Sequence, residues 1–169
     1  MRRKYYKRGL AWFGGWPTLL IGLLLLSLRF RSQKTTTTMT PKQIISQGLS
    51  SYMDEQTVKF WTAVSDFETG SWTSPIFIQN RNLFGMRLPT SNTTAIGGAD
   101  GHAVFASLQD SVADLILYFN RLQWPMLNFS TIDALVSMMK SKGYFAAPIG
   151  DYLAGVKARY QRLYPGEYV

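Results

Sequence analysis

The chain has 169 residues, enough for one domain and an appendage, and its formal net charge is +8. It has no cysteine, which excludes disulfides, cysteine nucleophiles and thiolate metal sites. A single histidine argues against a zinc centre, because such centres usually draw on two or more imidazoles. We therefore expect neither a metal nor any other cofactor.

The positive charge is confined to the start of the chain. Residues 35–169 hold ten basic and ten acidic residues and are neutral overall. A neutral domain has no general attraction for a phosphate backbone, so we expect no nucleic-acid partner. The first 34 residues have no acid and eight basic residues: Arg2, Arg3, Lys4, Lys7, Arg8, Arg29, Arg31 and Lys34.

Residues 9–28 form an uncharged, largely apolar run, long enough to cross the hydrocarbon core of a bilayer as a helix. Arg29-Phe30-Arg31 follows directly, with no small-residue cleavage site, which favours an uncleaved anchor over a cleaved secretory signal. Five basic residues precede the run and three follow it, so we expect a cytoplasmic N-terminus and an extracytoplasmic domain. A virion membrane is compatible with the same asymmetry.

These features divide the chain into four parts: a basic tail (1–8), a transmembrane anchor (9–28), a linker (29–40) and a domain (41–169). Four threonines, Thr35 to Thr38, lie in the linker. A polar run beside a membrane is typical of a spacer that holds a domain off the surface. A short strand is the alternative, since threonine favours β structure.

Helical spacing of apolar residues accounts for most of the domain. Thr40-Pro41 joins a capping hydroxyl to a first-turn proline and predicts a helix to about Met53. Asp54 can cap a second helix, which Gly70 would end just after Glu68. A short third helix is predicted to start at Ser74-Pro75.

The remainder of the domain contains one non-helical stretch. Leu88 to Gly101 is rich in Thr, Ser, Asn and Gly and predicts a short, degenerate β-hairpin or a loop. Helices are predicted over Ala103–Leu122, from Ser130-Thr131 to Lys142, and over Pro148–Tyr164. The expected fold class is therefore mainly α, preceded by one transmembrane helix.

Four segments of the domain form a recognisable series. In chain order they are Glu-Thr-Gly-Ser-Trp-Thr-Ser (68–74), Asn-Leu-Phe-Gly-Met (82–86), Phe105 to Asp114, and Gly-Tyr-Phe-Ala (143–146) with Tyr152 downstream. Together they resemble the glucosaminidase family of lysozyme-like peptidoglycan hydrolases, which occurs in flagellar assembly, autolysins and phages; the first two segments are the more specific ones. The resemblance extends from about Thr40 to Tyr164 and implies an α+β lysozyme-like fold with a reduced β-lobe.

The resemblance implies that Glu68 is the general acid that protonates the departing oxygen of a β-1,4 glycosidic bond. Burial next to apolar groups raises the pKa of a carboxyl, so that it holds a proton near neutral pH. Trp72 could supply such an apolar wall, or it could be a core or surface tryptophan. The simpler alternative for Glu68 itself is a solvated carboxylate at a helix end.

The sequence offers more than one candidate for the second catalytic group. The family often has an acid after a Thr-Thr pair, but Thr93-Thr94 is followed by Ala-Ile-Gly-Gly-Ala, and this stretch contains no glutamate. Asp100 is the only acid between Arg87 and His102, although an Asp-Gly pair is more often a turn. The sugar's own acetamide could instead attack, with Tyr144 hydrogen-bonded to it, or Tyr144 could be a core residue. His102 follows a glycine-rich turn, so we expect an exposed loop residue.

Asn80, Asn82 and Phe84 are expected to shape the floor of the cleft, and Trp72 is expected to bind substrate with them. By the resemblance, Asp114 would be structural. The expected function is a membrane-anchored peptidoglycan hydrolase whose partners are the glycan strand and the lipid bilayer. A degenerate module that binds glycan without cutting it is one alternative, which the missing lobe acid favours. A lytic transglycosylase is the other.

Overall fold

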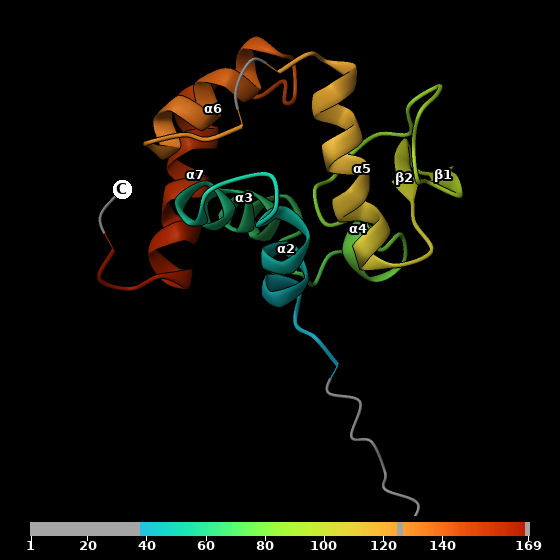
Figure 1. The fold of residues 1–169 in the computed structure, drawn as a ribbon, viewed down its shortest axis with the longest axis horizontal. Helices are drawn as coiled ribbons and strands as arrows, with labels where there is room; N and C mark the ends of the chain where they lie inside the picture. The colour runs from blue at the N-terminus through green and yellow to red at the C-terminus, as the bar shows by residue number, and fades with distance from the viewer. Residues whose placement is uncertain (1–37, 125–126, 168–169) are drawn as a thin grey trace, which may run out of the picture. The chain divides into compact units, whose positions relative to one another are not determined.

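The computed structural model describes residues 38–124 and 127–167 (Figure 1). The predicted tail, the predicted membrane anchor and residues 29–37 of the linker lie outside the described residues. Within the described residues, no helix is both long enough and apolar enough to cross a membrane. The described residues from Thr38 onward belong to one compact unit.

This unit is mainly helical, as the sequence predicts, with one small antiparallel hairpin. Asp54, Ser74 and Thr131 each accept a hydrogen bond from a backbone N–H in the first turn of the helix that follows, so these predicted starts are confirmed. The described elements are α2 (Pro41–Leu49), α3 (Glu55–Glu68), α4 (Pro75–Ile78), β1 (Gly97–Ala99), β2 (His102–Val104), α5 (Leu108–Arg121), α6 (Ile132–Ser141) and α7 (Ile149–Leu163).

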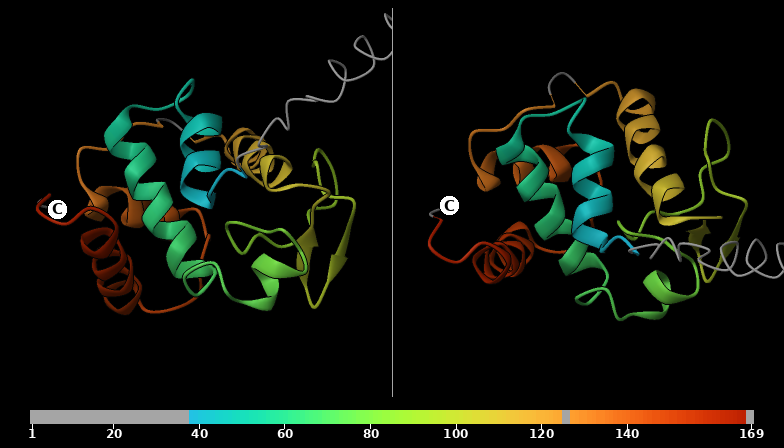
Figure 2. Two further views of the ribbon diagram at one scale, coloured as in Figure 1. Left: turned by 90° about the horizontal axis from the view of Figure 1, so that it is seen from below. Right: turned by 60° about the horizontal axis from the view of Figure 1, so that its bottom comes forward.

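Helix α3 is the centre of the helical part. It packs against α2 and α7, while α5 packs against α2 and α6 against α7 (Figure 1). Trp61 of α3 is fully buried. Its ring lies 5–6 Å, centroid to centroid, from those of Phe84, Phe119 and Tyr144, which come from three different segments. The hairpin lies beside α5, on the opposite side from α7 (Figure 2).

A glycine allows α7 to approach the C-terminal end of α3 closely. A Cβ atom at Gly155 would lie only 2.2 Å from Cε2 of Phe67, so no other residue fits there without displacing the ring. Phe67 also meets the ring of Tyr152 edge-on, with centroids 5.0 Å apart. This contact brings Tyr152 of α7 next to Glu68, the last residue of α3.

The prediction for residues 88–107 is wrong in part. A hairpin forms, but its second strand, β2, occupies residues assigned to the long helix, and α5 begins only at Leu108. The backbone N–H groups of Ala103 and Phe105 donate to the main-chain carbonyl oxygens of Met86 and Asn80. These N–H groups are therefore not available for the hydrogen bonds of a helix. Ala103 and Phe105, two residues apart, are both buried, which is the period of a strand.

Candidate active site

Glu68 lies at the C-terminal end of α3 and lines a cavity of about 800 Å³. A cavity of this size is in the range of ligand sites. The other walls come from the Phe84–Pro89 loop, strand β2, the end of α5 and the α6–α7 loop. The lining residues are Glu68, Phe84, Gly85, Met86, Arg87, Leu88, Pro89, His102, Tyr118, Arg121, Leu122, Gly143, Tyr144, Phe145 and Ala146. Among these described residues, Glu68 has the only carboxylate.

Burial raises the pKa of Glu68 above its ordinary value. Two effects oppose this shift: a hydrogen bond from Tyr152 and the nearby His102, both of which favour the ionised form. The Tyr152 hydroxyl donates to Oε1 of Glu68 at 2.5 Å. Burial also raises the pKa of Tyr152, so that the phenol keeps its proton and remains a donor. The net result is a carboxyl that holds its proton to higher pH than a solvated glutamic acid.

Replacing Tyr152 by Phe should raise the pKa of Glu68 further, because the lost hydrogen bond stabilises the ionised carboxylate. A general acid works only while protonated, so the alkaline limb of the rate–pH profile should move to higher pH. The ring contacts with Phe67 and Phe145 do not need the hydroxyl and should persist. The check is the rate of glycan cleavage as a function of pH, measured for the wild-type protein and for the Tyr152→Phe variant. A lower rate with an unmoved alkaline limb would show that Tyr152 only supports the fold.

Gly85 lies close to the second carboxyl oxygen of Glu68. Its φ is 62°, and a Cβ atom there would lie 3.0 Å from Oε2 of Glu68. No hydrogen bond reaches this oxygen from any described residue. Oε1 accepts from Tyr152, so the proton of the neutral carboxyl can be held on Oε2.

Tyr144 and Phe84, both expected at the site, do line the cavity with Glu68. The Tyr144 hydroxyl donates to the carbonyl oxygen of Phe84 at 2.7 Å. Burial raises the pKa of Tyr144 well above its usual value, and the charge of Glu68 adds to that rise. The phenol is therefore a fixed, protonated group beside the acid.

Trp72 does not line the Glu68 cavity. Its indole Nε1 donates to the Ser65 hydroxyl at 3.0 Å, and the ring packs against the hydrophobic core. Ser71 and Trp72 both have positive φ, which is uncommon for residues other than glycine. Trp72 thus anchors the sharp turn after Glu68, and the core alternative is the one observed.

An ion pair between a buried carboxylate and a half-exposed arginine holds the same turn, and it was not predicted from the sequence. Asp66 is fully buried, and Arg162 of α7 donates to both of its carboxylate oxygens at 2.5 Å. Arg159, one helical turn earlier, donates to the Ser71 hydroxyl at 2.9 Å. These contacts join α7 to the end of α3 over more than 80 residues of chain. No local pattern in the sequence pairs them.

Asn80 and Asn82 were predicted to form the cleft floor, and neither lines the cavity. Asn82 is fully buried, and its amide is used completely. Its Nδ2 donates to the carbonyl oxygens of Met86 and Ala103, and its Oδ1 accepts from the backbone N–H groups of Phe84 and Met86. Asn80 is buried and receives the N–H of Phe105 through its carbonyl oxygen. Both residues support the loop from the side away from the cavity, and of the three predicted floor residues only Phe84 lines the cavity.

Asp100 occupies the hairpin turn, with φ of 50°, and its side chain is exposed. It does not line the cavity, so the turn alternative fits better than the catalytic one. His102 was expected to be an exposed loop residue. It instead lies on β2, is partly buried, and lines the Glu68 cavity. The glycines before His102 indicated a loop. The strand that follows is only three residues long, which is too short to show the alternating pattern of a strand in the sequence.

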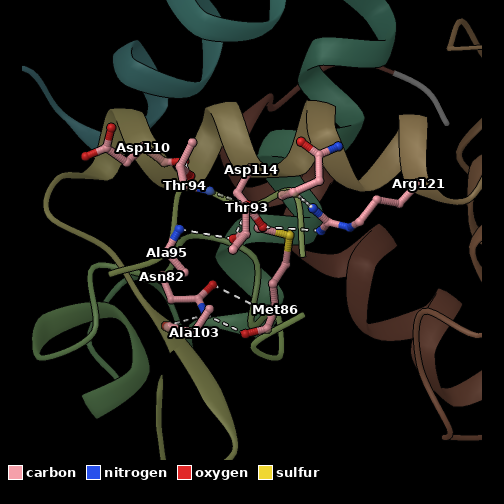
Figure 3. Close-up of polar contacts among 10 residues, drawn as sticks. Asn82, Met86, Thr93, Thr94, Ala95, Ala103, Asp110, Asp114 and Arg121 are labelled. Carbon is pink, nitrogen blue, oxygen red and sulfur yellow. Dashed lines mark hydrogen bonds and ion pairs between the residues drawn. The ribbon is translucent and has the colours of Figure 1, made fainter. Parts of the chain in front are cut away.

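The threonine pair of the lobe is fixed to α5 by Asp114 (Figure 3). The Thr93 hydroxyl and the Thr94 backbone N–H both donate to Oδ1 of the fully buried Asp114, at 2.5 and 3.0 Å. Arg121 pairs with Oδ2 at 3.4 Å and also donates to the carbonyl oxygen of Asn92. Asp114 is therefore a structural residue, as the resemblance implies, and it also positions Arg121 at the edge of the cavity.

A second cavity, of about 640 Å³, lies beside α2 and Tyr164. Its acid, Glu55, is exposed over 85% of its side chain and pairs with Lys59 at 3.0 Å. Among the described residues that line this second cavity there is no buried carboxyl. The cavity at Glu68 is therefore the stronger candidate for acid chemistry. Comparison of the chain with protein-family models, with curated proteins and with solved structures gave no match.

Proposed function

We propose that this protein is a peptidoglycan hydrolase of the N-acetylglucosaminidase type, with Glu68 as its general acid. The observation that carries the proposal is one partly buried carboxyl, with a raised pKa, facing a cavity of about 800 Å³. Proton transfer to the departing glycosidic oxygen from such a group typically accelerates cleavage by about 10²–10⁴-fold.

The architecture supports the same reading. The cavity is lined on one side by residues of α3, α5 and the α6–α7 loop, and on the other by residues of β2 and the loop before the hairpin; the acid comes from the end of a packed helix. We propose that this is a lysozyme-like arrangement with a reduced β-lobe. A rigid helix terminus suits a general acid, because the proton must be delivered in a fixed geometry.

The charge of the cavity fits an anionic polymer. Arg87 and Arg121 both line it, opposed by the single carboxylate of Glu68, which is protonated in the active form. Peptidoglycan carries carboxylates on its muramic acid residues and peptides, and guanidinium groups bind carboxylates well. The domain as a whole is neutral, so this attraction is local to the cavity.

We propose further that residues 9–28 anchor the enzyme in a lipid bilayer, with the domain extracytoplasmic or held at a phage internal membrane. In that position the enzyme would serve cell-wall remodelling, phage penetration or lysis. The apolar run and its flanking charges support this proposal.

One observation favours the second candidate, a module that binds glycan without cutting it. The described residues that line the cavity offer no carboxylate besides Glu68. A lytic transglycosylase also needs only one acid, and it would release a 1,6-anhydro end.

Mass spectrometry of peptidoglycan digested by the full-length protein in detergent distinguishes the three functions. We expect fragments with a reducing N-acetylglucosamine end. A reducing muramic acid end would show that the bond after N-acetylmuramic acid is cut instead of the bond after N-acetylglucosamine. An anhydro end would identify a transglycosylase. Undigested glycan that still binds the protein would establish the binding module and contradict the proposal.

A further inference from the structure

His102 is the one histidine of the chain, and it faces the same cavity as Glu68. On strand β2 the side chain of Ala103 is fully buried, so the alternation of a strand turns His102 and Val104 to the other face. His102 is near enough to Glu68 for its charge to lower the pKa of that carboxyl, although this is the smallest of the three effects, after burial and the Tyr152 hydrogen bond. Glu68 and His102 therefore lie near each other in one cavity.

The turn before β2 sets the tautomer of His102. Its Nδ1 lies 3.0 Å from the backbone carbonyl oxygen of Asp100. A carbonyl oxygen can only accept, so Nδ1 carries the hydrogen, and in the neutral ring the lone pair is on Nε2. No described residue makes a hydrogen bond to Nε2. The ring thus presents an unused base to the cavity.

The other lining groups cannot take this role. Arg87 and Arg121 stay protonated at any working pH. Burial raises the pKa of the phenols of Tyr118 and Tyr144, which makes them donors. Glu68 must begin the reaction protonated and so cannot also accept a proton.

We propose that His102 is the general base that activates the hydrolytic water, in place of the missing lobe carboxylate. The inference rests on the proposed glycosidase function. As the bond between C1 and the leaving oxygen breaks, Oε2 of Glu68 gives its proton to that oxygen. A water oxygen bonds to C1 from the opposite face, and its proton passes to Nε2 of His102. Water is the only co-reactant, and the anomeric configuration is inverted.

The stereochemistry of the wild-type reaction is the first test. Proton NMR of chitooligosaccharide or peptidoglycan fragments in the first minutes of digestion should show the α-anomer as the initial product of β-bond cleavage. The β-anomer would show that the substrate's acetamide attacks, and would overturn the role of His102 while leaving the glycosidase function intact. Absence of any cleavage by the wild-type protein would overturn both.

The second test is His102→Asn. The asparagine amide can keep the hydrogen bond to the Asp100 carbonyl oxygen, but it has no base at the position of Nε2. We expect kcat to fall by about 10²–10⁴-fold with KM changed little. Azide needs no deprotonation and should restore turnover, releasing an α-glycosyl azide.

Gln161→Ala, an exposed position on α7, is the control and should behave like the wild-type protein. A His102→Asn variant that keeps wild-type kcat would contradict the inference. A His102→Asn variant whose lost turnover is not restored by azide would also contradict it. If only the base is missing, an anionic nucleophile that needs no deprotonation should replace the water.

Discussion

Replacing Glu68 by Gln should abolish muralytic activity, lowering kcat by at least about 10²–10⁴-fold, while the fold persists. Glutamine keeps the size of the side chain and can still accept the Tyr152 hydrogen bond through its amide oxygen. It has no proton to give to a departing sugar oxygen. The measurement is release of reducing ends from peptidoglycan, with circular dichroism to confirm the fold.

The same variant should be at least as stable as the wild-type protein at pH 8. The pKa of Glu68 is raised in the folded state, so folding favours its proton, and wild-type stability falls as pH rises from about 4.5 through the folded-state pKa. Glutamine does not ionise and escapes this loss. Thermal unfolding at pH 8 and pH 4 should show an advantage for the variant only at pH 8.

Glu55→Gln is the matched control, because Glu55 is the first residue of the same helix and is largely exposed. Its activity and its stability should both stay close to wild type, since exposed ion pairs contribute under about 1 kcal/mol. Unchanged activity in the Glu68 variant would remove Glu68 as the acid. A matching loss in the Glu55 variant would point to a general effect on folding.

Replacing Asp114 by Ala should cause a large loss of stability in this domain, roughly 3 kcal/mol in the free energy of unfolding. The substitution leaves the Thr93 hydroxyl, the Thr94 N–H and the Arg121 guanidinium without their carboxylate (Figure 3). For a domain of this size the melting temperature should fall by roughly 10 °C. Thermal or urea unfolding measures the change.

Two further variants separate the causes. Asp114→Asn keeps an oxygen for the two threonine donors but loses the charge that pairs with Arg121, so its stability should be intermediate. Asp133→Ala removes a half-exposed carboxylate on α6 that pairs with Lys157, and should cost under about 1 kcal/mol. Equal melting temperatures for the Asp114 and Asp133 alanine variants would show that Asp114 does not hold the lobe to α5.

Helix boundaries were the part of the fold that the sequence predicted best. Thr40, Asp54, Ser74 and Thr131 each cap the helix that was predicted to follow. A cap contacts residues two or three positions further along, so the necessary information is local. The start of α5 was missed because its true cap, Ser107, lies beyond apolar residues that continue the helical period in the sequence.

The candidate site was predicted unevenly. Glu68, Phe84 and Tyr144 come together around one cavity, whereas Asp100 and Trp72 do not line it. Phe84 and Tyr144 are joined to each other by the hydrogen bond from the Tyr144 hydroxyl to the Phe84 carbonyl oxygen, and both rings pack on Trp61 of the helix that ends in Glu68. The two residues that do not line the cavity are held by other partners: the hairpin turn for Asp100, and the Ser65 hydroxyl for Trp72.

Most of the helical segments, and the acid at the end of the second helix of the domain, could be predicted from the order of the residues. The surroundings of that acid could be known only once the chain was folded. Tyr152 binds Glu68 from 84 residues away, and Gly85 and His102 come from the loop and the hairpin that close the cavity. Helix starts and stops depend on contacts within one turn of the chain, whereas the pKa of a carboxyl depends on every group that excludes water from it, and those groups are brought together only by folding.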